Sequence, residues 1–102
     1  MKIRSNLEKD VLTLYLSGEL DETACASAKI LLDACIDRNP SKAVVFDFSE
    51  LSFMDSSGIG LLIGRFKRLQ TRSIPVWLAN PSSVVDKILR ISGLYRLMPK
   101  IC

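Results

Sequence analysis

The sequence predicts a single α/β domain, and three features indicate this fold class. Within residues 11–17, Leu12, Leu14 and Leu16 alternate with Thr13, Tyr15 and Ser17, which is typical of a half-buried strand. Short apolar runs at Ala43–Phe46 and Pro75–Ala79 are typical of buried strands, and a helical period follows each of them. The resulting order, ββαβαβαβ, predicts a mixed sheet of about four or five strands with helices covering one face.

The N-terminal third predicts a hairpin followed by a helix. Residues 2–6 form the expected first strand, and the turn at residues 7–10 joins it antiparallel to the strand at residues 11–17. Asp21 is expected to cap the first helix, because aspartate accepts hydrogen bonds from free backbone N–H groups. Residues 38–41, Arg-Asn-Pro-Ser, end that helix. Its expected sheet-facing side comprises Ala24, Ala28, Leu31, Leu32 and Cys35, while Lys29, Asp33 and Asp37 face solvent.

The central stretch, Asp47–Gly60, joins the strand at Ala43–Phe46 to a second helix. Small, turn-forming residues at 55–58 precede a helical period, so Ser56 lies at a strand-to-helix junction. A serine at this position can cap the helix by accepting a hydrogen bond from the first turn. The alternative is a serine placed for modification. The residues expected to face the sheet from this helix are Ile59, Leu62, Ile63, Phe66 and Leu69.

The C-terminal third predicts a strand, a helix and a weak last strand. Asn80 is expected to cap the third helix, with Pro81 at its first position. Gly93 is expected to end this helix, and residues 97–101 are expected to form an edge strand weakened by Pro99. No linker or repeat interrupts the chain, so we expect one domain over residues 1–102. The apolar face of the third helix comprises Val84, Val85, Ile88 and Leu89.

The composition excludes several functions. The 102 residues contain no histidine, so there is no Ser-His-Asp or Cys-His arrangement, and we expect the protein not to be an enzyme. The net charge of +3 comes from scattered residues, which argues against nucleic-acid binding. No signal peptide or membrane-spanning run is present, and cytoplasmic location is expected. Cys25, Cys35 and Cys102 lack C-x-x-C spacing, and Cys25 and Cys35, which fall in a helical stretch, are expected to be core or partly exposed thiols.

No cofactor or metal is expected. Gly58, Gly60 and Gly64 are spaced G-x-G-x-x-x-G and lie within the second helix, which does not match a dinucleotide-binding loop. A weak anion site at the helix N-terminus remains physically reasonable. The acidic residues Asp47, Glu50 and Asp55 show no coordination pattern, and they are expected to cap a helix or lie in a solvated turn.

The second helix also predicts a docking surface. If Leu62 and Ile63 face the sheet, a stripe of residues spaced four, three and four apart faces solvent. An exposed leucine beside a helix-interior glycine, which costs about 1 kcal/mol relative to alanine, favours a flat surface for a partner protein. A scattered surface leucine is the simpler alternative. The stripe consists of Ser57, Leu61, Gly64 and Arg68.

Three segments, Gly18–Asp21, Leu51–Gly60 and Ser92–Leu94, resemble the STAS domains of bacterial anti-anti-sigma factors. The central segment, continuing through Gly64–Lys67, is especially similar to the sporulation anti-sigma F factor antagonists. The resemblance covers nearly the whole chain. Two segments depart from it: Thr71–Ile74 lacks a glycine pair, and the C-terminus lacks a long last helix.

The resemblance implies a function in which proteins exchange partners. The unphosphorylated antagonist binds an anti-sigma factor that is also a serine kinase, and the sigma factor is released. Phosphorylation of the serine after the motif aspartate, here Ser56, switches binding off, and a metal-dependent serine phosphatase restores it. The chain alone is expected to be monomeric. The expected partner-binding residues are Asp21, Asp55, Ser57, Gly58, Leu61, Gly64 and Arg68.

Two other functions remain open at this point. A small hydrolase or nucleotide-processing enzyme using Ser56 is disfavoured by the missing histidine and the missing phosphate loop. The second alternative is a STAS module of another kinase and phosphatase pathway that regulates stress responses or secretion.

Overall fold

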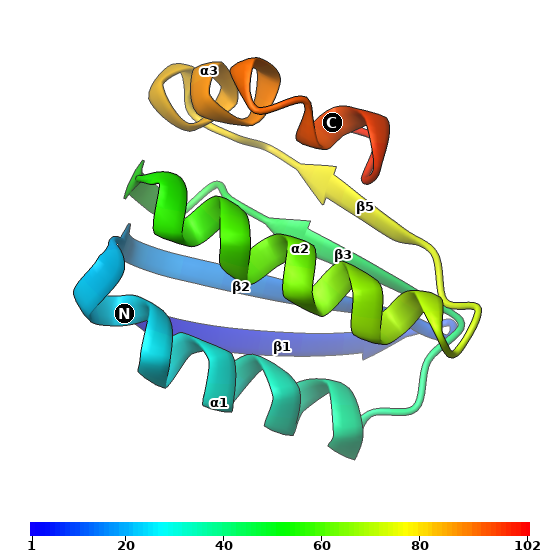
Figure 1. Cartoon of the computed structure of the whole chain (residues 1–102). Coiled ribbons are helices and arrows are strands. Elements are labelled where there is room, and N and C mark those ends of the chain that lie inside the picture. Colours follow the sequence, from blue (N-terminus) through cyan, green and yellow to red (C-terminus); the bar gives the residue numbers. More distant parts are fainter.

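The computed structural model of the protein describes residues 1–102, and Figure 1 shows a sheet with helices packed along one face. The elements in chain order are β1 (Lys2–Glu8), β2 (Val11–Leu20), α1 (Glu22–Arg38), β3 (Ala43–Asp47), β4 (Leu51–Met54), α2 (Ser56–Gln70), β5 (Val76–Ala79), α3 (Ser83–Ile91) and a short 3-10 helix, η1 (Leu94–Arg96).

The sheet is mixed, as the sequence predicts. Its strands follow the order β1-β2-β3-β5, with β1 antiparallel to β2 and the remaining pairs parallel. Leu12, Leu14 and Leu16 of β2 are fully buried beneath the helices, whereas the residues between them are only half-buried. This alternation explains the sequence pattern, because only one face of the sheet is covered.

The strand β4 was not predicted. It is four residues long and pairs in parallel with the last residues of β2, beyond the stretch of β2 that pairs with β3. The pairing register shifts between Gly18 and Glu19, and Gly18 adopts a φ of 102°, which favours glycine. The bulge at this point lets β2 pair with β3 along its first half and with β4 at its end.

Of the three residues considered as helix caps, only Asp21 is one in the structure. Asp21 caps α1 as expected, since its Oδ1 atom accepts a hydrogen bond from the Ala24 N–H at 2.9 Å. The cap of α2 is Asp55 and not Ser56, which is the first helical residue. The cap of α3 is Ser82, because Asn80 has a positive φ of 55° and turns the chain before the helix begins.

Some predicted helix faces also need correction. In α1 the buried residues are Ala28, Leu32 and Ile36, while Leu31 is 42% exposed. In α3 Val85 and Leu89 are buried, but Val84 is exposed. These helices lie at the edges of the layer, where a narrower apolar stripe is enough to cover the sheet.

The chain beyond α3 follows the prediction only in part. Gly93 adopts a left-handed conformation directly after Ser92, the C-cap of α3, as expected of a helix stop. Instead of a full edge strand, the chain forms η1 and then a single parallel bridge between Leu78 and Lys100. Proline at position 99 cannot donate a backbone hydrogen bond, which limits the pairing.

Candidate functional site at the N-termini of α1 and α2

The junctions β2–α1 and β4–α2 lie side by side because β2 and β4 are parallel neighbours. The backbone N–H of Asp55 donates to the carbonyl of Leu20 at 3.3 Å, which ties the two junctions together. Both helices therefore begin at the same end of the sheet, where the carboxyl ends of parallel strands commonly form functional sites. Figure 1 shows the start of α2 directly after the tip of β4.

Two aspartate side chains organise this end of the sheet. Asp55 Oδ1 accepts from the Ser57 N–H at 2.9 Å, as Asp21 does from Ala24. The carbonyl of Asp55 also accepts from the N–H groups of Gly58 and Ile59. The first turn of α2 is thus largely hydrogen-bonded without any contribution from a serine hydroxyl.

Ser56 is exposed, and its hydroxyl makes no hydrogen bond to another protein group. Ser57 is half-buried, and its backbone N–H is held by the Asp55 cap. Of the two adjacent hydroxyl groups, that of Ser56 is therefore the more accessible to another protein. Its position on the first residue of α2 also places it in the positive end of the helix dipole.

Carboxylates converge on this end of the molecule. The pKa of the half-buried Cys25 thiol is raised, first by burial and then by the nearby negative charges of Asp55, Asp21 and Glu22. A polar depression of about 410 Å³ lies at the start of α1 and includes Glu19 and Asp21 in its lining. A further negative charge on Ser56 would be placed among these groups.

Gly58, expected to bind a partner, has a packing role in the structure. It is buried, and a Cβ atom added to it would lie 2.6 Å from Met54 Cγ and 3.1 Å from the side chain of Leu20. Only glycine lets the first turn of α2 approach β2 and β4 this closely. The residue supports the site from within and presents no side chain to a partner.

The predicted solvent-facing stripe of α2 instead faces α1. Leu61 is only 8% exposed, so the expectation that it projects into solvent is wrong. Arg65 and Arg68, further along this side of the helix, form ion pairs with Asp33 of α1 at 2.9 and 3.1 Å. The side of α2 predicted to receive a partner protein therefore lies against a helix of the same chain.

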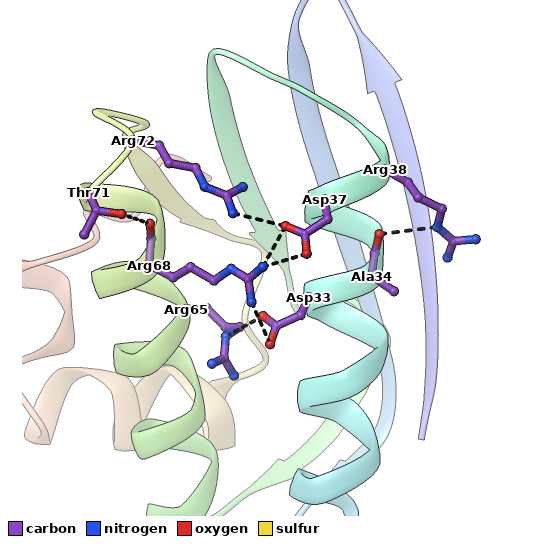
Figure 2. Close-up of polar contacts among 8 residues, drawn as sticks. All are labelled: Asp33, Ala34, Asp37, Arg38, Arg65, Arg68, Thr71 and Arg72. Carbon is purple, nitrogen blue, oxygen red and sulfur yellow. Dashed lines mark hydrogen bonds and ion pairs between the residues drawn. The ribbon is translucent and has the colours of Figure 1, made fainter.

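A cluster of five charged residues joins α1 to α2 and is drawn in Figure 2. Arg68 also donates two hydrogen bonds to Asp37 at 2.7 and 2.6 Å, and Arg72 adds another to the same carboxylate. The hydrogen bond from Arg68 is the main reason that the pKa of Asp37 is lowered. We refer to Asp33, Asp37, Arg65, Arg68 and Arg72 as the inter-helix ion cluster.

The rotation of α2 exposes a different stripe, which the sequence prediction missed. The exposed residues of the helix, together with the half-buried Ile63, are spaced four and three apart along one side, starting at Ser56. The signal available in the sequence was the charge complementarity between Asp33 and Asp37 on one helix and Arg65 and Arg68 on the next. The exposed stripe comprises Ser56, Gly60, Lys67 and Gln70, and Ile63 between them is partly buried against the core.

The structure thus brings together four of the predicted site residues, Asp21, Asp55, Ser56 and Ser57. Gly58 and Leu61 are buried, and Arg68 is engaged in the inter-helix ion cluster; the half-buried Gly64 lies on the same side of the helix. The structure contains no group of three or more histidine, cysteine or acidic side chains that could hold a metal ion. None of its helices has the length and apolar character needed to cross a membrane.

Comparison with known proteins agrees with this geometry. The sequence matches the STAS domain family over residues 2–102, so the chain belongs to this family. It is 31% identical over 99 residues to an anti-sigma F factor antagonist of Paenibacillus polymyxa, covering 97% of this chain and 85% of that protein. It is 34% identical over 86 residues to the protein of the same name from Lysinibacillus sphaericus, covering 84% and 74% of the two chains.

The fold also matches a solved member of the family. The structure of the anti-sigma factor antagonist SpoIIAA in its unphosphorylated form aligns with a TM-score of 0.80 at 30% identity, over 99% of this chain and 89% of that one. These relationships confirm the resemblance found in the sequence and the predicted fold class. They also establish the chain as a regulatory binding protein and not an enzyme.

Proposed function

We propose that this chain is an anti-sigma factor antagonist whose binding to an anti-sigma factor, itself a serine kinase, is switched off by phosphorylation of Ser56. The relatives named as anti-sigma F factor antagonists support the first part of this proposal. The exposed Ser56 hydroxyl, free of any capping role at the start of α2, supports the second. A protein similar to this chain, SpoIIAA, has a structure in the phosphorylated form, with a TM-score of 0.71 at 29% identity.

The proposed inhibition is electrostatic. A phosphate on Ser56 adds about −1.5 to −2 charges at a helix N-terminus, which tolerates anions, so the fold is expected to persist. The same charge buried in a protein interface, beside Asp55 and near Asp21, meets repulsion and loses its hydration. A penalty of roughly 3 kcal/mol weakens binding by about two orders of magnitude. No refolding is required.

The proposed partner surface is centred on the starts of α1 and α2. It includes Asp21, Asp55 and Ser57 from the predicted set and extends along the exposed stripe of α2 through Gly60. Gly58 and Leu61 act indirectly by holding α2 in place. Arg68 is assigned to the contact between the helices, and Gly64 lies on the same side of α2 with open space around its Cβ position.

The remaining components of the proposed pathway act on the chain from outside. A metal-dependent serine phosphatase removes the phosphate from Ser56 and restores binding. Neither the binding nor the inhibition requires a cofactor in this chain. The proposed setting is sporulation, in the cytoplasm, where the sigma factor and its regulators meet.

A second pathway has a specific observation in its favour. The chain is 28% identical over 87 residues to an anti-sigma-B factor antagonist of Listeria monocytogenes, covering 85% of this chain and 75% of that protein. The alternative is therefore a STAS module of a stress or secretion pathway with its own kinase and phosphatase. Identification of the kinase captured by the chain distinguishes the two pathways.

The test begins with a pull-down from extract of the native cell, with and without ATP, followed by calorimetry with the captured anti-sigma factor. Ser56→Ala should bind and resist phosphorylation, whereas Ser56→Asp should fold normally and bind poorly. Gln70→Glu is the matched control, because it adds a negative charge at the far end of the same exposed stripe. Unchanged affinity of Ser56→Asp would contradict the electrostatic mechanism, as would phosphate mapped mainly to Ser57 by mass spectrometry.

A further inference from the structure

The strand β1 forms an unprotected edge of the sheet. It pairs only with β2, no other element pairs with its outer side, and six of its seven residues are exposed. Such an edge offers a row of free backbone N–H and C=O groups to any strand that can align with it. No proline or bulge interrupts β1 to prevent this.

The hairpin turn determines which backbone groups point outward. Lys9 and Asp10 both have positive φ values, 51° and 66°, and form a two-residue turn closed by the pair Glu8 and Val11. In such a hairpin the closing pair exchanges backbone hydrogen bonds, and alternate residues follow the same pattern. The N–H and C=O groups of Ile3, Ser5 and Leu7 therefore point away from β2.

We propose that this edge pairs with β1 of a second copy of the chain, antiparallel, about a two-fold axis at Ser5. In this register the residue numbers of each opposing pair sum to ten. The outward backbone groups of Ser5, Ile3 and Leu7 therefore hydrogen-bond to those of Ser5, Leu7 and Ile3 in the second copy. Lys2 lies opposite Glu8, Arg4 opposite Asn6, and Ile3 opposite Leu7. Opposite charges thus meet at Lys2 and Glu8, and the positions between them pair polar with polar and apolar with apolar side chains, as a self-complementary interface requires.

Exposed apolar side chains beside β1 also favour a second copy of the chain as the partner of this edge. Leu7 is 44% exposed on the helix-covered face, and Leu31 of α1 is 42% exposed. Leu31 lies two turns before Arg38, which Figure 2 shows on the side of α1 away from α2. A second copy paired through β1 brings its own α1 alongside and covers Leu7 and Leu31 on both chains. One strand and one helix edge form a small interface, so the dimer is weak and the expected monomer persists in dilute solution.

The dimer is independent of the proposed function. Within the sheet β1 and β4 lie on opposite sides of β2, so pairing through β1 leaves the junction of β4 with α2, and therefore Ser56, accessible. A variant can thus lose the dimer and still bind the anti-sigma factor, or lose that binding and still form the dimer.

Sedimentation equilibrium of the purified chain, from about 10 µM to about 1 mM, tests the proposal in the range where small interfaces associate. The wild-type chain should show a concentration-dependent dimer. Ser5→Pro should remain monomeric and folded, because it removes an outward N–H and none of the hydrogen bonds to β2. A wild-type chain that is monomeric throughout, or a dimer that Ser5→Pro leaves intact, overturns the proposal; the first result leaves the edge to a strand of another protein.

A charge exchange tests the register. Lys2→Glu and Glu8→Lys each place like charges opposite one another at two symmetric positions, and each should weaken the dimer about tenfold. The double variant restores opposite charges and the net charge of the wild type, so its dissociation constant should return to the wild-type value. A double variant as weak as either single variant overturns the pairing about Ser5.

Discussion

Asp55 accepts a hydrogen bond from the Ser57 N–H at 2.9 Å, so Ser56, which lies between them in the chain, caps nothing. A serine that capped the helix would have its hydroxyl committed to the backbone, and modification would break that contact. Here the structural role belongs to the aspartate and the hydroxyl remains free. The separation of the two roles explains how Ser56 can be modified without loss of the helix.

This separation makes a prediction for stability. Asp55→Ala should lower the free energy of unfolding by about 1 kcal/mol, because it removes the cap of α2. Ser56→Ala should change it by less than about 0.5 kcal/mol, because an exposed first-turn hydroxyl makes no contact to lose. Urea denaturation of both variants measures the difference. Equal losses would show that Ser56 shares the capping role.

Two glycines of α2 should respond in opposite ways to alanine. Gly58→Ala should destabilise the domain by about 1–3 kcal/mol, because the new Cβ overlaps Met54 and Leu20. Gly64→Ala should stabilise it by about 1 kcal/mol, because no atom lies within 4 Å of the added Cβ and alanine favours the helix.

Thermal melts of the two glycine variants, with Gly60→Ala as a third, give the comparison. Gly60 is also helical with open space around its Cβ position, so it should follow Gly64. Destabilisation by Gly64→Ala would mean that α1 approaches this part of α2 more closely than the structure shows.

Sequence patterns that involve only residues near one another in the chain predicted most of the fold. The alternation of leucines in β2 reports burial of one face directly, and the Asp21 cap depends only on its nearest neighbours in the chain. The order of strands and helices then restricts the topology to a mixed sheet with one covered face. The expectation for Ser56 followed from a motif and not from periodicity.

The rotation of α2 about its own axis could not be predicted from its apolar periodicity. The helix buries two sides, one against the sheet and one against α1, and a single period does not distinguish them. The helix packs on the sheet through residues such as Leu62 and Leu69, and on α1 through Leu61 and Arg65. A prediction that considers one helix alone places an arginine in solvent, because the acidic partner that allows its burial lies on a different helix. Similarly, β4 is too short for its alternation to be distinguished from a loop.

A third prediction concerns acid stability. Asp86 of α3 accepts hydrogen bonds from Tyr95, Arg90 and Lys100, and these, Tyr95 foremost, hold its pKa well below the usual value. A carboxylate with a lowered folded-state pKa contributes stability that is complete above its unfolded pKa, about 4, and is lost as the pH falls below it.

Asp86→Asn should therefore reduce stability at neutral pH and flatten the decline of stability between about pH 4 and pH 2. The measurement is the urea midpoint as a function of pH. Asp10→Asn is the control, because the carboxylate of Asp10 makes only one long surface ion pair, 3.7 Å from Lys42. An unchanged acid limb in Asp86→Asn would assign the acid sensitivity to other carboxylates.

The last prediction concerns the inter-helix ion cluster and the position of α2. The side chains of Arg65 and Asp33 are 9% and 18% exposed, and their 2.9 Å contact is an ion pair without an aligned hydrogen bond. Loss of one member leaves the other charge with little access to water, which costs more than the pair itself contributes. Asp33→Asn should thus destabilise the domain by about 2 kcal/mol, whereas Asp37→Asn, at the exposed end of the cluster, should have little effect.

Replacing both buried charges, Asp33→Leu with Arg65→Met, should recover most of the loss, because an apolar pair can fill the same space. Urea denaturation of the three variants provides the comparison. If Asp33→Asn costs no more than Asp37→Asn, the arginine reaches solvent and the charges do not determine how α2 lies against α1.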